Sequence, residues 1–530
     1  MTAPASGTFS RGLWLGVVFL SGAGTMLLEL VAPRLVQPWF GASSFVWTNV
    51  IGVILVALSV GYFLGGRWAE RPGRRRRIAS LLIAPALIAF AIPFAAPGLA
   101  GWLSPDPIDS IALGDARRQL ELASLVAAIL LFAPPVLLLA AVTPQVIAEL
   151  ADSGLEPGRA AGRVFAVGTL GSLVGTFLPT YLLVPLLGSR MSIVASGGML
   201  AVAGLLVLLG PTRRGGLAML LALPLAFGIG AAASGGPLRA AIATEAEVEE
   251  IESAYQYLRV ARETPREPAL AGRLETVLKI DEGLRDFHSV LVDGRPDTGG
   301  KYYDTVALMP ALLPADRELE VAILGSGAGT TARMLREQWG NRIGSVVNVD
   351  VDPAVLALEE RFGWRPVEGR DVSLALDGRA FLRLSRHAFD LLVVDAYARQ
   401  IDIPSHMATV EFFRLAHSRL RAGGVLALNA SALDLDGDLV QALLRSLRDA
   451  GFDEVQVAPV RHWGNAILYA ARSGRLDPAR LGPVPETLET AARDLRRLSR
   501  PVEPRADAPR LVDGNAPVEW LTQRALGGEG

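Results

Sequence analysis

A glycine-rich loop in the second half of the chain contains residue types that can hold a nucleoside. The apolar segment LEVAIL leads into Gly325, Gly327 and Gly329, and a helix is expected to follow them. Glycines let the main chain approach a ligand closely, and the N-terminus of a helix offers free N–H groups. Tight turns between a strand and a helix also need glycine for steric reasons, so the loop alone leaves both interpretations open.

Aspartates at the ends of the next expected strands favour ligand binding. The segment SVVNVDVDP contains Asp350 and Asp352 about 21 residues after Gly329, where an acid can accept hydrogen bonds from both hydroxyls of a ribose. Asp377 in DGRAFL is expected at the end of a third strand, near an adenine edge, and Asp395 follows the apolar strand FDLLVV. Each aspartate could instead cap the helix that follows it, and this alternative applies most to Asp352.

The elements that must position these residues form an α/β pattern that begins near Leu319. Parallel strands present their carboxyl ends at one edge of a sheet, so the loop and the aspartates are expected in one crevice. Before this pattern, ESAYQYLRVARE, RLETVLKI and FHSVLVDG alternate as β-strands. We therefore expect a β-stranded subdomain, a nucleoside-binding domain, and a C-terminal helix with a closing segment, over residues 239–315, 316–482 and 483–530.

The first 240 residues have the composition of a membrane domain. They contain 16 Arg, no Lys and 9 acidic residues, whereas the rest of the chain contains 35 basic and 44 acidic residues. Apolar runs long enough to cross a bilayer predict an all-α polytopic domain of about seven helices over residues 1–238. The runs lie at about 12–32, 45–65, 78–100, 122–147, 164–187, 191–210 and 217–234.

The segment RWAERPGRRRR, between the second and third runs, orients this domain. Arginine-rich loops stay in the cytoplasm, so this segment is expected inside the cell. Seven spans would then place the second half of the chain outside. The weakest point of this count is the Pro134-Pro135 pair in the fourth run.

Glu29 is an ionisable residue within the first apolar run. Charges inside a membrane are costly, and they usually face a cavity or a partner. One hypothesis is a structural contact of Glu29 with Arg34 or Asn49. The other is a membrane site for a cation or a polar headgroup.

The composition excludes several classes of site. With no cysteine, the chain has no disulfide framework, no thiolate metal site and no cysteine nucleophile. The five histidines lack the spacing of metal ligands, so no metal is expected. The second half has no basic run that would indicate nucleic-acid binding.

Together, these motifs resemble the spermidine synthase family of aminopropyltransferases, in the bacterial form fused behind a multispanning membrane domain. The resemblance covers residues 250–475 through Tyr255-Gln256, KYYDTVALMP, GSGAGT, VDVDP, DGRAFL, VVDAY and EFF, and LVDGNAPVEWL resembles the closing segment. It implies a Rossmann-like methyltransferase-type fold behind a β-stranded piece. It also implies transfer of an aminopropyl group from decarboxylated S-adenosylmethionine to a diamine such as putrescine. A multi-pass protein of the cell (inner) membrane and a homodimer are expected.

The resemblance also implies roles for individual residues. Donor binding falls to the glycine loop and two carboxylates: Gly325, Gly327, Gly329, Asp350 and Asp377. Three polar side chains would line the substrate cleft: Gln256, Tyr302 and Tyr397. Asp395 would be the base, because an alkylamine with a pKa near 10 is an ammonium ion at neutral pH and must lose a proton before it can attack.

Two departures from the family pattern leave the donor and the acceptor open. Ala328 stands where the family's glycine loop has an acid, and Ala398 stands where a second diamine-binding acid is expected. Asp402 or His406 could replace that acid, or this loop could be solvated. Two alternatives remain. One is an S-adenosylmethionine-dependent methyltransferase acting on a lipid or membrane-associated acceptor. The other is a polyamine transporter or sensor with a non-catalytic synthase-like domain.

The membrane face of the C-terminal domain also stays open. The donor nucleoside is made in the cytosol, whereas seven spans would place this domain outside the cell. The sequence does not resolve that conflict.

Overall fold

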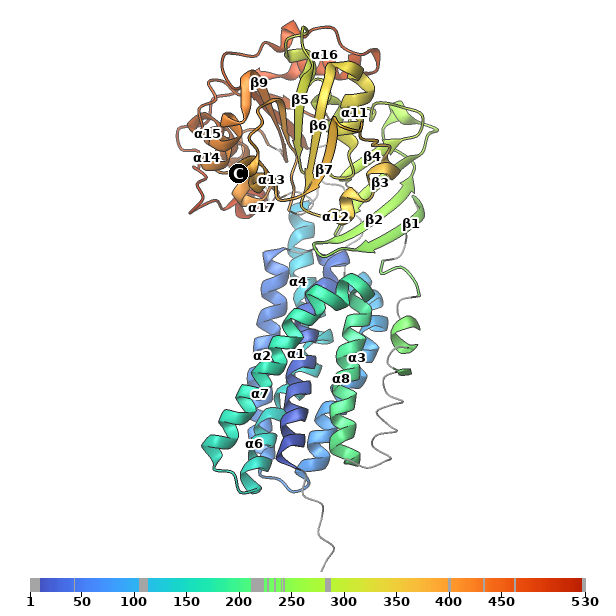
Figure 1. Ribbon diagram of the computed structural model, residues 1–530, viewed down its shortest axis with the longest axis vertical. Coiled ribbons are helices and arrows are strands. Elements are labelled where there is room, and N and C mark those ends of the chain that lie inside the picture. Colours follow the sequence, from blue (N-terminus) through green and yellow to red (C-terminus); the bar gives the residue numbers. More distant parts are fainter. Residues whose placement is uncertain are drawn as a thin grey trace, which may run out of the picture. The chain divides into compact units, whose positions relative to one another are not determined.

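The computed structural model describes residues 10–41, 43–103, 113–210, 224–225, 228–232, 235–239, 241, 244–281, 287–398, 402–431, 434–461 and 464–526. The chain divides into two units (Figure 1). The helical unit comprises residues 1–106, 118–240 and 252–257. The α/β unit comprises residues 107–117, 241–251 and 258–530. The domain boundaries expected at residues 238, 315 and 482 stay predictions.

The helices of the first part of the chain are α1 (Arg11–Phe40), α2 (Ser44–Ala69), α3 (Arg74–Leu103), α4 (Leu113–Leu131), α5 (Ala133–Ala140), α6 (Val142–Asp152), α7 (Pro157–Leu178), the π-helix η2 (Pro179–Leu183) and α8 (Val184–Leu209). Among the described residues, five helical stretches are long and apolar enough to cross a membrane. They are residues 11–40, 44–69, 74–103, 133–152 and 157–209.

Five stretches are found where seven runs are expected, and the difference has local reasons. The stretch 157–209 has 53 residues, and a straight helix of that length would be about 80 Å long, more than twice the thickness of a bilayer core. It contains two expected runs, α7 and α8, which run in opposite directions in Figure 1 and are joined through η2 and a non-helical Gly188. The seventh expected run, 217–234, lies largely outside the described residues.

Glycines allow helices of the helical unit to pack with their backbones in contact. A Cβ on Gly61 of α2 would lie 2.3 Å from the carbonyl oxygen of Leu137 in α5. A Cβ on Gly171 of α7 would lie 2.1 Å from the carbonyl oxygen of Phe19 in α1. Any larger residue would push these helices apart, so both glycines are required by packing.

One end of the helical unit collects arginines. Arg11, at the start of α1, donates a hydrogen bond to the carbonyl oxygen of Ser153 beyond the end of α6, at 3.0 Å. Arg75, at the start of α3, donates to the carbonyl oxygen of Val207 near the end of α8, at 2.8 Å. The starts of α1 and α3 and the ends of α6 and α8 therefore share this arginine-rich end.

The opposite end of the helical unit holds chain segments from beyond α8. Arg190, near the start of α8, donates a hydrogen bond to the carbonyl oxygen of Gly236 at 2.8 Å. Arg34, near the end of α1, donates to the carbonyl oxygen of Ala254 at 2.7 Å. Because α8 ends at the arginine-rich end, Leu209 and Gly236 lie at opposite ends of the unit.

Two sheets follow in the chain. The first has four strands in the order β1-β2-β3-β4, with β1 (Glu245–Glu252), β2 (Tyr257–Glu263), β3 (Glu275–Ile280) and β4 (Ser289–Val292). The second has eight strands in the order β12-β10-β11-β9-β8-β5-β6-β7. Its strands are β5 (Leu319–Leu324), β6 (Ile343–Asp350), β7 (Asp371–Ala375), β8 (Phe389–Val394), β9 (Leu420–Ser431), β10 (Gln456–Pro459), β11 (Asn465–Ala471) and β12 (Arg500–Pro501).

The eight-stranded sheet is doubly wound. Strands β7, β6, β5, β8 and β9 are parallel, β11 is antiparallel to both β9 and β10, and β12 is antiparallel to β10. The strand order reverses between β5 and β8, and sheets of this kind bind ligands beyond the carboxyl ends of the strands at that point. The expected Rossmann-like fold behind a small β-sheet is confirmed.

Helices cover both faces of this sheet, so its central strands are mostly apolar. Ala322 and Leu324 of β5 pack on one face, with α13 (Gly378–Leu384), α14 (Val410–Ser418), α15 (Asp438–Asp449) and α17 (Val518–Leu526). Val321 and Ile323 pack on the other, with α10 (Tyr302–Val306), α11 (Thr330–Trp339) and α16 (Glu489–Leu498). Alternate residues of β5 thus pack into the two hydrophobic cores on opposite faces of the sheet.

Candidate active site

The glycine loop lies between β5 and α11, where its glycines have structural reasons of their own. Gly325, Gly327 and Gly329 have φ values of +77°, +54° and +82°, which other residues rarely adopt. A Cβ on Gly325 would also lie 2.4 Å from the Cα of Ala396. A Cβ on Gly329 would lie 2.8 Å from the Cβ of Trp364. The steric interpretation therefore holds for these glycines, and their place in donor binding stays a prediction.

Asp350 joins the glycine loop to the end of β6. One of its carboxylate oxygens accepts a hydrogen bond from the N–H of Gly327, and the other accepts one from the N–H of Asp352, both at 3.0 Å. Burial raises the pKa of Asp350 to about 6, although these hydrogen bonds oppose the rise. A carboxylate that touches the glycine loop at the end of β6 is suitably placed to accept ribose hydroxyls.

Asp352 and Asp377 both cap helices. Asp352 is buried and accepts a hydrogen bond from the N–H of Ala354 at 2.9 Å, at the start of α12 (Pro353–Leu356), so the capping interpretation of Asp352 is confirmed. Asp377 accepts one from the N–H of Ala380 at 2.8 Å, at the start of α13. Its second oxygen lies 2.8 Å from Nε2 of His406. Burial tends to raise the pKa of Asp377, but these contacts outweigh it and lower the pKa.

A pocket of about 290 Å³ lies beside the Asp377–His406 pair. Arg379 and Asp513 meet there in a two-pronged ion pair, with both N–O distances at 2.6 Å. The closing segment LVDGNAPVEWL thus returns to this part of the site, because Asp513 belongs to it. His406, Thr409 and Asn515 also line the pocket.

Asp395 follows β8 at the point where the strand order reverses. It caps no helix. One carboxylate oxygen accepts a hydrogen bond from the hydroxyl of Tyr302 at 2.9 Å, and the other accepts one from Nδ2 of Asn429 at 2.8 Å. Burial raises the pKa of Asp395 to about 7, the two hydrogen bonds oppose this rise, and the charge of nearby Asp350 adds to it.

Aromatic side chains surround this carboxylate. The hydroxyl of Tyr397 donates a hydrogen bond to the carbonyl oxygen of Asn429 at 3.1 Å, and the ring of Phe287 stacks on Tyr302 with centroids 6.0 Å apart. Burial and the charge of Asp395 raise the pKa of both tyrosines well above its usual value. Both therefore stay neutral and can donate hydrogen bonds at neutral pH.

Asn429 is the neighbour of Asp395 that sequence reasoning missed. It lies in β9, and its side-chain oxygen accepts a hydrogen bond from Nδ2 of Asn465 at 3.1 Å, in β11. The sequence signal for Asn429 is the segment GGVLALNAS, in which an apolar strand ends in a polar residue. Its relation to Asp395 depends on the pairing of β8 with β9.

The structure also places the residues at which this chain departs from the family pattern, and the residues that could replace the missing acid. Ala328 is fully buried in an apolar cluster with Val260 and Phe362, and its relation to the donor stays a prediction. Asp402 is 6% exposed, which excludes the solvated loop for that residue. His406 contacts Asp377, at the expected adenine end of the site.

Two predicted residues belong to the helical unit. Gln256 lies in the turn 252–257, where its carbonyl oxygen accepts a hydrogen bond from the N–H of Ser253 at 2.9 Å, and its place in the cleft stays a prediction. Glu29 lies in α1. The hypothesis of a contact with Arg34 or Asn49 is wrong, because Arg34 donates to main-chain carbonyls and Asn49 donates to the carbonyl oxygen of Glu121 at 2.9 Å.

No group of three or more His, Cys, Asp or Glu side chains that could hold a metal occurs in the described part of the chain.

Comparison with known proteins gives a consistent set of relatives. No family model matches the chain. A probable polyamine aminopropyl transferase of Bifidobacterium longum is 30% identical over 295 residues, which cover 52% of this chain and 62% of the relative. Polyamine aminopropyltransferase 2 of Pseudomonas aeruginosa is 32% identical over 28% of this chain and 43% of its own. Polyamine aminopropyltransferase 1 of Streptomyces coelicolor is 24% identical over 88% of this chain and 85% of its own. The chain thus spans less than two thirds of the first two relatives.

Among solved structures, a probable spermidine synthase from Corynebacterium glutamicum is 20% identical. The match covers 52% of this chain and 98% of that chain, with a TM-score of 0.39.

Proposed function

We propose that this chain belongs to the spermidine synthase family of polyamine aminopropyltransferases and that its α/β unit is an aminopropyltransferase. The donor is decarboxylated S-adenosylmethionine, and the acceptor is a diamine such as putrescine. The observation that carries this proposal is the carboxylate of Asp395, which is held by two hydrogen bonds at the reversal point of the sheet. The reaction needs a base that takes the proton of the acceptor amine, and ligands of such sheets bind at this reversal point.

Asp395 supplies that base. The acceptor amine attacks the carbon beside the sulfonium, the carbon–sulfur bond breaks, its electrons stay on sulfur, and the proton of the amine passes to Asp395. A base works best when its pKa approaches the working pH, so a carboxylate with a pKa of about 7 accepts this proton more readily than one near 3.8. Tyr302 and Asn429 fix the carboxylate, and the remaining lone pairs of its oxygens are left for the amine.

Donor binding is assigned to the strand ends beside Asp395. Asp350 accepts the ribose hydroxyls, and the main chain at Gly325, Gly327 and Gly329 lies against the nucleoside. Asp377 meets the adenine edge through the oxygen that now contacts His406. Tyr397 and Tyr302 present neutral hydroxyls to the cleft, and the negative charge of Asp350 and Asp395 attracts a dicationic acceptor.

The identity of the leaving nucleoside tests this proposal. Purified protein in detergent receives decarboxylated S-adenosylmethionine or S-adenosylmethionine, each with a panel of diamines and extracted lipids, and products are identified by mass spectrometry. Methylthioadenosine with an amine longer by one aminopropyl group supports the proposal. S-adenosylhomocysteine would instead establish a methyltransferase acting on a lipid or membrane-associated acceptor. That second candidate is favoured by Ala398, which is exposed where the family has an acid.

We also propose that the helical unit is a multi-pass domain of the cell (inner) membrane, with lipid around it. Five stretches are long and apolar enough to cross a bilayer, and they present large apolar side chains outward. Val56, Phe63 and Leu186, for example, are 65%, 63% and 70% exposed. Side chains of this kind are stable at the surface only against lipid or a partner.

The arginine-rich end of the helical unit is assigned to the cytoplasm, because positive loops stay inside. Residues 252–257 lie at the opposite end, and no further candidate span occurs in the described residues after them. The donor nucleoside is made in the cytosol, so the side of the membrane on which the C-terminal part of the chain lies decides whether it meets that pool. A reporter fused after Gly530 tests this side: active alkaline phosphatase would place the C-terminus outside the cytoplasm, and bright green fluorescent protein would place it inside. A homodimer stays a prediction that light scattering of the purified protein tests.

A further inference from the structure

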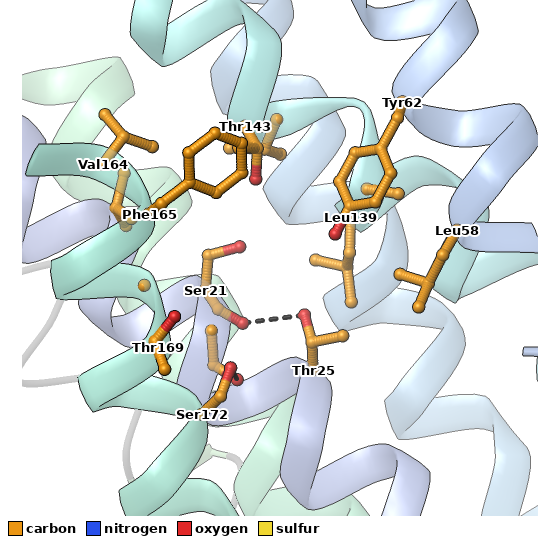
Figure 2. Close-up of a pocket in the computed structure, with 15 residues that line it drawn as sticks. Ser21, Thr25, Leu58, Tyr62, Leu139, Thr143, Val164, Phe165, Thr169 and Ser172 are labelled. Atoms are coloured by element: carbon orange, nitrogen blue, oxygen red, sulfur yellow. Dashed lines mark hydrogen bonds between the residues drawn. The ribbon is translucent and has the colours of Figure 1, made fainter. Parts of the chain in front are cut away.

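The helical unit contains a cavity that the proposed transferase reaction does not use. It has a volume of about 150 Å³ and lies between α1, α2, α7 and the junction of α5 with α6 (Figure 2). Six hydroxyl groups line it: Ser21, Thr25, Tyr62, Thr143, Thr169 and Ser172. Figure 2 shows their side chains around one common space. A hydroxyl-lined cavity within an apolar helical bundle calls for a polar ligand.

Two of these hydroxyls are arranged to accept hydrogen bonds. The hydroxyl of Thr25 donates to the carbonyl oxygen of Ser21 at 2.7 Å, and that of Ser172 donates to the carbonyl oxygen of Gly22 at 3.4 Å. A hydroxyl has one hydrogen and two lone pairs, so a donor bond to its own or a neighbouring helix leaves its lone pairs for a ligand.

Prolines add further acceptors to this region. Pro144 has no N–H, so the carbonyl oxygen of Ala140, which lines the cavity, lacks its regular helical donor. Ala141 lies at the junction of α5 and α6, and its backbone angles stay in the right-handed helical region. In the same way, Pro33 leaves the carbonyl oxygen of Glu29 without its regular donor.

The carboxylate of Glu29 is the nearby charge. Ser21, Thr25 and Glu29 follow one another at intervals of four residues, so they lie on one face of α1. Glu29 interacts electrostatically with Tyr62, which lines the cavity. Within the described residues, Glu29 forms no hydrogen bond or ion pair. An unpaired acid beside a cavity without basic side chains attracts a cation.

The remainder of the wall is apolar. Leu58, Leu139 and Phe165 face the same space and offer carbon atoms to the ligand (Figure 2). A cavity of roughly 150 Å³ holds a benzene-sized molecule, which has six heavy atoms. Phe165 is 58% exposed and Tyr62 is 45% exposed, so the cavity is open to its surroundings between α2 and α7. The ligand therefore combines a cationic head with a short carbon chain.

We propose that this cavity binds a primary ammonium group on a short carbon chain, with Glu29 as its counter-ion. An ammonium group has three donors and no acceptor, which matches a lining of lone pairs and a carboxylate. Such a group occurs on free alkylamines and diamines and on the headgroup of phosphatidylethanolamine. This site is separate from that of Asp395, and it would exist even if the α/β unit catalysed a different reaction.

Binding of radiolabelled butane-1,4-diamine to the full chain in phosphatidylcholine nanodiscs tests the proposal. All proteins carry Asp395→Asn and receive no nucleoside, so the α/β unit contributes the same background to each. Glu29→Gln should weaken binding at least tenfold, and Thr25→Val should weaken it severalfold. Ser59→Ala is the matched control, because the Ser59 hydroxyl also donates to its own helix, at 2.9 Å, but on the exposed side of α2. It should leave binding unchanged.

The proposal would be overturned if the Glu29→Gln protein bound the diamine as tightly as the protein with Glu29 intact. Equal losses of affinity for Thr25→Val and Ser59→Ala would also overturn it. Thermal unfolding of every variant reports folding, and Glu29→Asp, which keeps the carboxylate, should retain part of the affinity if Glu29→Gln does not fold. Butylamine should displace the diamine, whereas displacement by potassium but not by butylamine would refute an ammonium site. Phosphatidylethanolamine in the nanodiscs should compete only if the lipid is the natural source.

Discussion

Two carboxylates of this chain, Asp395 and Glu29, lie in opposite surroundings. Both oxygens of Asp395 accept hydrogen bonds from side chains, whereas Glu29 forms none within the described residues. Asp395 is thus fixed in position for one proton transfer, and Glu29 is left free to pair with an incoming charge. The comparison shows that an acid oriented for catalysis is recognised by the side chains that donate hydrogen bonds to it. An acid placed to bind a cation is recognised by the lack of such donors.

The largest effect is expected where the fixed carboxylate is removed. Asp395→Asn should lower kcat on the order of a hundredfold or more, because no other group takes the proton of the amine. Nucleoside binding should stay intact, as measured by calorimetry. Asp352→Asn, which keeps a capping side chain at a neighbouring strand end, is the control. A kcat for Asp395→Asn equal to that of the parent enzyme would reject Asp395 as the base.

The pH dependence of turnover should follow Asp395. Its carboxylate must be deprotonated to act as a base, and burial raises its pKa to about 7. We therefore expect kcat/KM to fall about tenfold per pH unit below pH 7 and to level off above it. This acid limb should be absent from the residual activity of Asp395→Asn. An acid limb with a pKa near 4 would show that the base is an ordinary exposed carboxylate.

A smaller effect should come from loosening the carboxylate. Tyr302→Phe removes the hydrogen bond at 2.9 Å that favours the ionised form of Asp395, so the pKa of Asp395 should rise and the acid limb should move to higher pH. At pH 7 we expect a loss of about tenfold, because a hydrogen bond to a charged group contributes roughly 1.5–3 kcal/mol. Tyr469→Phe, which removes a hydroxyl bonded to Ser499 in the same unit, should change neither limb nor rate.

The smallest effect concerns stability. A carboxylate whose pKa is raised in the folded protein binds its proton more tightly there than in the unfolded chain, so stability falls as pH rises from about 4 to 7. Asp395→Asn removes this cost. Its melting temperature, relative to the parent, should therefore be higher at pH 8 than at pH 4. If the difference in melting temperature between Asp395→Asn and the parent is the same at both pH values, burial does not raise the pKa of Asp395.

The strand-end positions could be predicted from the sequence, whereas their partners could not. An apolar segment followed by Asp350 or Asp395 places a carboxylate at the edge of a sheet whatever the strand order is. Asn429 reaches Asp395 only because β9 pairs with β8, and His406 reaches Asp377 from a distant loop. Such pairings depend on topology and loop paths, which residue spacing along the chain does not encode.

The helical unit shows the same limit in another form. Apolar length predicted α1, α2 and α3 well, since each is one uninterrupted run. The last of the described runs are interrupted at the π-helix η2 and at the non-helical Gly188, where hydropathy alone carries no signal.

One competition experiment tests the central claim most directly. The full chain in detergent receives equal concentrations of decarboxylated S-adenosylmethionine and S-adenosylmethionine with putrescine, and both leaving nucleosides are quantified in the same sample. The account predicts that methylthioadenosine accumulates together with the aminopropylated diamine, and that Asp395→Asn abolishes both products. Accumulation of S-adenosylhomocysteine with unmodified putrescine would contradict it.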